Sequence, residues 1–148
     1  MKLKAWGAPA IAVFLGLIYG YSAWTKLADP QVFTLSLEGY SFLRAWASFL
    51  VWAVPIGELA LASLLILSVI WKWQKGLRGG LLLAAAGFAA FTLLLAWALW
   101  TGEGQAGCGC FGGLEPVTPW DLLRDGIFLL LALAGFFLAG RPNGLLDH

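Results

Sequence analysis

Long stretches without a charged residue limit the possible folds of this chain more than any other feature of its sequence. The 21 residues between Lys4 and Lys26 carry no charge, and neither do the 24 residues between Arg78 and Glu103. A helix needs about 20 apolar residues to cross the hydrocarbon core of a bilayer, so each stretch can cross once. Apolar residues make up 61% of the chain and charged residues 11%, against about 25% charged in an ordinary soluble domain. These values exclude a water-soluble globular protein.

Two further stretches complete the pattern. The 27 residues between Arg44 and Lys72 contain a single charge, Glu58, and the 15 residues between Asp125 and Arg141 contain none. The apolar residues run continuously and do not alternate with polar ones, which is typical of membrane helices and not of barrel strands. We therefore predict an all-α membrane protein, a four-helix bundle whose single domain takes in all 148 residues. The predicted transmembrane helices are 5–27, 46–71, 79–100 and 119–139.

The first apolar stretch also raises the alternative of a removable signal peptide, because Lys2 and Lys4 precede it. It is longer than the apolar region of a signal peptide, about 7–15 residues. No small-x-small cleavage site ends it before Trp24 and Lys26. We therefore expect the first helix to be retained.

The distribution of Lys and Arg predicts the orientation. Six of the nine cations fall on one side of the predicted bundle: Lys2, Lys4, Lys72, Lys75, Arg78 and Arg141. The cation-rich side of a membrane protein faces the cytoplasm, so both termini are predicted inside and the first and third loops outside. Eight of the nine tryptophans fall at predicted helix ends, where indole rings favour the headgroup level. This arrangement predicts a multi-pass protein of the bacterial inner membrane.

Local patterns predict two further features. Four residues of the first outer loop are spaced for one helical face: Phe33, Leu37, Tyr40 and Arg44. This spacing predicts a short amphipathic helix lying on the outer leaflet. In the last predicted helix, the sequence from Thr118 to Asp121 indicates a helix start, with an N-cap, a proline at the first position and an acid at the third.

Both cysteines of the chain lie in the third loop, in the sequence Gly-Cys-Gly-Cys-Phe-Gly-Gly, as Cys108 and Cys110. A structural disulfide is one interpretation, but so short a loop would constrain the unfolded chain very little. Metal binding is a second, but a zinc-like site needs four ligands, and His148 and Met1 are predicted on the other side of the membrane. The third is redox exchange, because a strained, exposed disulfide is easily reduced. We favour redox exchange and expect no metal.

Ionisable residues in the predicted spans are the other candidates. Glu58 lies near the middle of the second helix, just after Pro55, where an unpaired carboxylate is costly. It is either a structural partner of a cation or a proton carrier or ligand contact. We expect it to face the bundle interior and to reach Lys26 or Arg124, with water or a kink at Pro55 closing the gap in depth. Lys26 could instead extend to the membrane surface.

Arg124 and Asp125 lie in the first turns of the last predicted helix, close in sequence to the cysteines. They would form one polar cluster with Glu58 and Lys26 beneath the cysteine loop. A cation near a thiol also favours the reactive thiolate.

Taken in order, these residues resemble the MauE branch of the DoxX-like membrane proteins. The resemblance runs over nearly the whole chain, and the Cys-x-Cys-Phe-Gly element that begins at Cys108 is its most specific part. It also takes in Tyr40, the Pro-Ile-Gly-Glu sequence that ends at Glu58, and the sequence from Ser22 to Pro30. Members of the family typically have Arg-Asn where this chain has Arg124-Asp125, which is a departure from the pattern.

The resemblance implies a four-helix protein that supports disulfide formation outside the cytoplasm together with a thioredoxin-like partner. DoxX-like relatives are linked to quinone-dependent redox chemistry, and by analogy of fold the bundle resembles quinone-coupled disulfide generators and vitamin K epoxide reductases. Such an analogy does not establish a quinone site. With two cysteines, this chain can relay one electron pair at a time.

These observations predict a membrane thiol:disulfide oxidoreductase. Cys108 and Cys110 would exchange electrons with an extracytoplasmic thioredoxin-like protein, and a quinone is the candidate acceptor. The candidates for contacts with the quinone and for proton transfer are Lys26, Glu58, Arg124 and Asp125. The alternatives are a small four-helix transporter that uses Glu58 and a redox-inert assembly scaffold. A net charge of +1 gives no basic surface for nucleic acid.

Overall fold

The computed structural model describes residues 2–102 and 118–140, and these contain helices and connecting turns but no strand. Four of the helices are long and apolar enough to cross a membrane. This confirms the prediction of an all-helical protein with four candidate spans. In chain order the elements are α1 (Lys2–Ala28), α2 (Pro30–Glu38), the short 3₁₀ helix η1 (Arg44–Trp46), α3 (Ala47–Ile70), α4 (Gln74–Thr101) and α5 (Pro119–Ala139).

The predicted boundaries differ most at the start of α4. The prediction began this helix at residue 79, after the last cation, but α4 begins at Gln74. Charged residues do not end a helix, and the five residues from Gln74 to Arg78 continue its hydrogen bonding. Its other end is set by Gly102, whose φ of +75° lies in the left-handed region that glycine favours. The predicted start of α5 is confirmed, because the backbone N–H of Thr118 donates to the Asp121 carboxylate at 2.9 Å.

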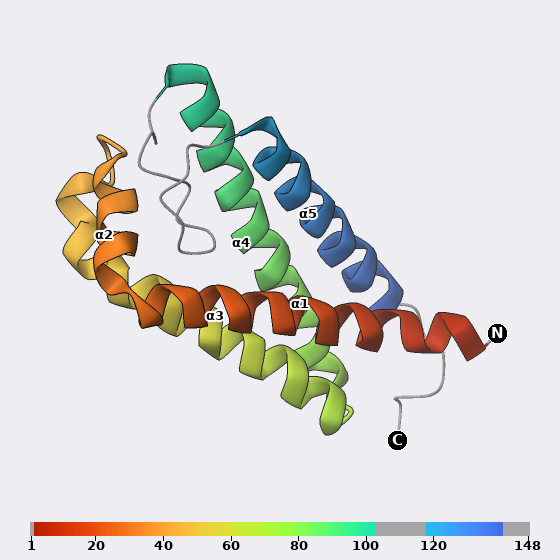
Figure 1. Ribbon diagram of the computed structural model, residues 1–148. Coiled ribbons are helices and arrows are strands. Elements are labelled where there is room, and N and C mark those ends of the chain that lie inside the picture. The colour runs from red at the N-terminus through yellow and green to blue at the C-terminus, as the bar shows by residue number, and fades with distance from the viewer. Residues whose placement is uncertain (1, 103–117, 141–148) are drawn as a thin grey trace.

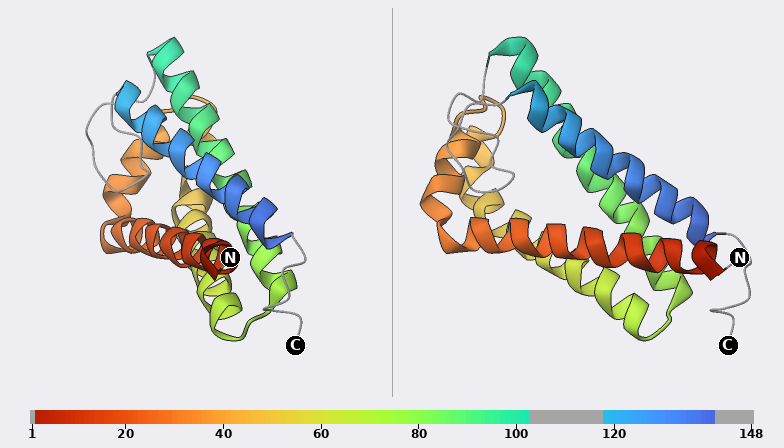
Figure 2. Two further views of the ribbon diagram at one scale, coloured as in Figure 1. Left: turned by 90° about the vertical axis from the view of Figure 1, so that its right-hand side faces the viewer. Right: turned by 45° about the vertical axis from the view of Figure 1, so that its right-hand side comes forward.

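The long helices form two pairs that separate toward one end of the molecule. Helix α1 packs along α3, and α4 packs along α5. Figures 1 and 2 show the two pairs meeting near the N-terminal end of α1 and diverging toward the end where α2 lies. Close approach at the meeting point depends on glycine. A Cβ atom at Gly135 of α5 would lie 3.0 Å from Ile11 and 3.2 Å from Leu81.

The first connection contains the short helix α2, which the Asp29 carboxylate caps by accepting from the Val32 N–H at 3.2 Å. Its buried residues Phe33 and Leu37 pack in one cluster with Ala47 and Val51 of α3. The helix ends at Glu38, so Tyr40 and Arg44 lie beyond it and do not continue its face as predicted. The placement of this segment on the outer leaflet stays a prediction.

Candidate functional site

A buried ion pair joins α1 to α3. Lys26 Nζ lies 2.8 Å from Glu58 Oε1 and 2.9 Å from Oε2, and it donates to the Ser22 hydroxyl at 2.6 Å. The Ser22 hydroxyl lies one turn before Lys26 and donates to Glu58 at 3.1 Å. The side chains of Lys26 and Glu58 are 0% and 6% exposed. The expected contact between Glu58 and a cation is therefore confirmed for Lys26, and extension of Lys26 to the surface is wrong.

The ion pair is direct and needs neither the bridging water nor the kink that the sequence suggested. The first turns of α3 are opposite α2, because Ala47 and Val51 pack against Phe33 and Leu37. The end of α1, which carries Lys26, therefore lies beside the middle of α3, which carries Glu58. The difference in membrane depth between these two residues that their positions in the sequence suggested is largely absent. Helix α3 itself stays helical across Pro55.

Two aromatic rings from other helices flank the ammonium group of Lys26. Its Nζ lies 5.5 Å from the centre of the Phe33 ring of α2 and 5.4 Å from that of Phe91 of α4. A cation over an aromatic face is attracted by the electron density of the ring. The ion pair therefore lies where four helices, α1 to α4, meet.

A small cavity extends the polar cluster to α5. It has a volume of about 20 Å³ and is lined by Ile18, Tyr19, Ser22, Glu58, Phe88, Phe91 and Asp125. Asp125 is 3% exposed and lies 3.3 Å from Arg124 Nε. Arg124 also pairs with Asp121 at 3.3 Å, on the partly exposed side of α5. The structure thus brings Lys26, Glu58 and Asp125 around one region, whereas the two ion pairs given above for Arg124 are with residues of its own helix.

Tyr19 belongs to this cluster but was not a candidate from the sequence. Its hydroxyl donates to the Ala84 carbonyl of α4 at 2.8 Å, and its ring lies 4.8 Å from that of Phe88. Gly87 faces it, since a Cβ atom there would lie 2.4 Å from the Tyr19 hydroxyl. The available signal was spacing, because Tyr19, Ser22 and Lys26 are three and four residues apart and share a helix face.

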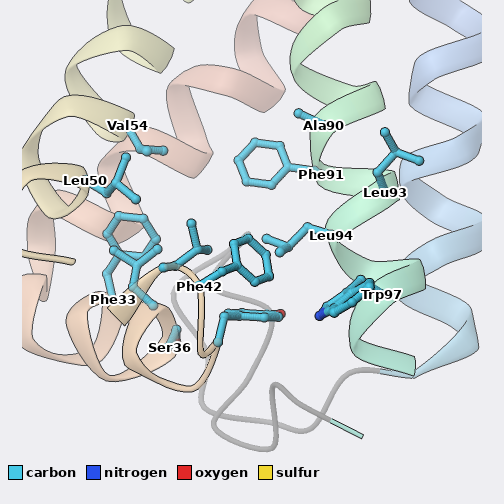
Figure 3. A pocket seen from close by; sticks show the side chains of 13 residues that line it. Phe33, Ser36, Phe42, Leu50, Val54, Ala90, Phe91, Leu93, Leu94 and Trp97 are labelled. Atoms are coloured by element: carbon cyan, nitrogen blue, oxygen red, sulfur yellow. The ribbon is translucent and has the colours of Figure 1, made fainter. Parts of the chain in front are cut away.

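A much larger apolar pocket of about 680 Å³ lies between α2 and α3 on one side and α4 on the other. Figure 3 shows the side chains that point into it from the two sides. Its lining consists of Phe33, Ser36, Leu37, Tyr40, Phe42, Leu43, Leu50, Val54, Ala90, Phe91, Leu93, Leu94 and Trp97. Phe42 and Trp97 meet edge to face, with ring centres 6.3 Å apart, across the separation between the helix pairs. Sequence reasoning found no sign of this pocket.

The cysteines Cys108 and Cys110 lie outside the residues that the structure describes. The elements that flank them, α4 ending at Thr101 and α5 beginning at Pro119, have these ends on the same side of the molecule (Figure 1). The last turns of α4 also supply Leu93, Leu94 and Trp97 to the apolar pocket. In the sequence, the two cysteines therefore follow the helix whose last turns line this pocket.

A comparison with protein families gives a match to the family described as methylamine utilisation protein MauE, over residues 4–138. The chain belongs to the MauE family. The match takes in all four candidate spans of this MauE protein almost completely, and it confirms the resemblance seen in the sequence. No curated protein and no solved structure matches it.

Proposed function

We propose that this MauE-family protein is a membrane thiol:disulfide oxidoreductase. Cys108 and Cys110 form its redox centre, and a thioredoxin-like protein outside the cytoplasm is its partner. The observation that carries the proposal is the Cys-Gly-Cys sequence between α4 and α5, in a membrane protein of a family associated with methylamine utilisation. The protein belongs to the bacterial inner membrane, with the cysteine loop on the outer side.

A thiolate of the partner attacks the Cys108–Cys110 disulfide, and a mixed disulfide forms. The second thiol of the partner resolves it, which leaves the partner oxidised and Cys108 and Cys110 as thiols. Two electrons and two protons then pass to a quinone, whose two carbonyl oxygens become the hydroxyls of a quinol, and the disulfide forms again.

The apolar pocket between α2 and α4 supports a quinone as the acceptor. Its volume of about 680 Å³ is in the range of ligand sites, about 300–1,000 Å³. Its walls are apolar and include Phe42, Phe91 and Trp97, and aromatic side chains suit a planar ring. The Lys26–Glu58 pair lies behind Phe33 and Phe91, so polar groups are next to a pocket that offers few of its own.

The four ionisable candidates have different places in this proposal. Glu58 and Asp125 line the small cavity beside the pocket, and we assign proton transfer to them. Lys26 compensates the negative charge of the buried Glu58 carboxylate. Arg124 pairs with Asp125 and lies closest in sequence to the cysteines.

Partner capture tests the thiol exchange. The exchange can also run in reverse, so in Cys108→Ser or Cys110→Ser the remaining thiol can attack the disulfide of an oxidised thioredoxin-like protein. No second cysteine of this chain can then displace the partner, so in at least one of the two variants a mixed disulfide should accumulate. It is measured as a band on a non-reducing gel that disappears with reductant and is identified by mass spectrometry. The double variant Cys108→Ser/Cys110→Ser is the control and should show no band. If neither single variant forms a conjugate and both remain active, the protein is a scaffold without redox function.

A further inference from the structure

The apolar pocket and the small polar cavity share one wall. Among the residues that the structure describes, Phe91 of α4 is common to the linings of both. The other residues of the pocket lining are mainly apolar side chains of α2, α3 and α4. The lining of the cavity includes Glu58, Ser22 and Asp125. The ring also lies 5.4 Å from Lys26 Nζ, which favours this position.

The small cavity has the size and chemistry to hold one water molecule. A buried site needs at least about 10–15 Å³ and two to four polar partners to hold a water. This one has about 20 Å³, and four of the residues that line it carry polar side chains, Tyr19, Ser22, Glu58 and Asp125. A water there would be placed between Glu58 of α3 and Asp125 of α5.

Polar groups continue from this cavity to the surface of α5. Asp125 pairs with Arg124, whose side chain is 26% exposed. The groups around the cavity are Tyr19, Ser22 and Lys26 from α1, Glu58 from α3, and Asp125 with Arg124 from α5, while α4 contributes Phe88 and Phe91. Arg124, Asp125 and Glu58 thus form a series of polar groups from the partly exposed start of α5 to the buried part of α3. Phe91 lies at the end of this series.

We propose that Asp125, a cavity water and Glu58 form a proton route to the apolar pocket, and that the ring of Phe91 is its gate. The inference rests on the proposed function, because reduction of a quinone in the pocket takes up two protons along with two electrons. Each proton passes from Asp125 through the water to Glu58, and reaches a quinone oxygen when the Phe91 ring turns aside. Asp125 is reprotonated near Arg124, and the dithiol that supplied the electrons releases two protons as its disulfide forms.

The first test is the kinetics of Asp125 variants, with decylubiquinone as acceptor and dithiothreitol as reductant. Removal of an acid–base group typically slows proton transfer by a factor of about 10²–10⁴, so Asp125→Asn should lower kcat at least tenfold and increase the solvent deuterium isotope effect. The KM for decylubiquinone should stay unchanged. Asp125→Glu should restore the rate, and Glu38→Gln, which alters an exposed carboxylate at the end of α2 outside both linings, should behave as wild type. A wild-type kcat and isotope effect in Asp125→Asn would overturn the route.

The second test needs no turnover and so separates this inference from the proposed function. Ser22→Cys, placed in the Cys108→Ser/Cys110→Ser background, reports access to the cavity through its reaction with methyl methanethiosulfonate. Opening of a buried site limits such labelling, so Phe91→Ala should speed it by about tenfold or more, and Phe91→Leu should have a smaller effect. Leu94→Ala enlarges the pocket without touching the cavity and should leave the labelling rate unchanged. Equal rates with and without the Phe91 ring would overturn the gate, even in a protein that reduces no quinone.

Discussion

At the scale of single residues, the Lys26–Glu58 pair is the feature on which most of the site depends. Both charges are removed from solvent, and each is compensated by the other and by the Ser22 hydroxyl. Removal of one member of such a pair leaves the other charge buried without compensation, which costs about 3–5 kcal/mol. Removal of both members at once avoids most of this cost.

We therefore expect Glu58→Gln to lower the thermal stability of the purified protein in detergent and also its turnover. The double variant Lys26→Met/Glu58→Gln should recover most of the stability, since neither charge of the pair remains, but not the turnover. Thermal unfolding and quinone reduction per folded molecule are the two measurements. If Glu58→Gln loses stability but keeps its activity per folded molecule, Glu58 is a structural partner only. If it loses neither, the ion pair has no function in the native protein.

The sequence was informative about this pair because a lone carboxylate within an apolar span must find a partner. It could not show that Lys26 lies deep enough for direct contact, since that depends on α2 packing against the start of α3. Tyr19 and Phe91 were missed for another reason. Aromatic residues are common in membrane helices, and their type gives no indication that one of them lies beside a polar cavity.

At the scale of secondary-structure elements, contact between α1 and α4 depends on a glycine opposite a tyrosine. A Cβ atom at Gly87 would lie 2.4 Å from the Tyr19 hydroxyl and 3.4 Å from the ring carbon that carries it. A methyl group at position 87 would therefore clash with the Tyr19 hydroxyl but not with the Tyr19 ring. The same hydroxyl donates to Ala84, so a clash at Gly87 would also break a bond between the helices.

We expect Gly87→Ala to destabilise the protein by about 1–3 kcal/mol, the usual cost of overpacking. Tyr19→Phe removes the clashing atom, so Gly87→Ala should cost much less in the Tyr19→Phe background. Unfolding of the two single variants and the double variant measures this coupling. Gly79→Ala is the matched control on α4, because a Cβ atom there has no neighbour within 4 Å. Equal costs of Gly87→Ala in both backgrounds would show that the two side chains do not meet.

At the scale of the whole molecule, the charge-free stretches predicted four spans, but no pattern in the sequence predicted how the spans pair. Residues that face lipid and residues that face another helix are both apolar, so Leu130, which is 67% exposed, and Leu81, which is fully buried, look alike in the sequence. The separation of the two helix pairs and the pocket between them were therefore not predictable. The orientation in the membrane rests on the positions of Lys and Arg alone and stays a prediction.

Labelling of Cys108 and Cys110 in intact cells tests this orientation. An impermeant maleimide should react with them only after mild reduction, because both are predicted outside and joined as a disulfide at rest. A variant with a single cysteine in the first turn of α4, at its predicted cytoplasmic end, such as Lys75→Cys in the Cys108→Ser/Cys110→Ser background, should react only after permeabilisation. Labelling of the native cysteines that requires permeabilisation would reverse the topology, and labelling without reduction would argue against a resting disulfide.

The pairing of α1 with α3 has a consequence for how the chain is made. Synthesis proceeds from the N-terminus, so α1 and α3 leave the ribosome before α4 and α5. An isolated Lys or Glu at the bilayer centre costs about 2.5–3.5 kcal/mol on insertion scales, yet Lys26 and Glu58 lie on the first two long helices and contact each other directly. The nascent first half can therefore neutralise its own charges as soon as α3 enters the bilayer. The second half then inserts beside a partner whose two buried charges are already paired.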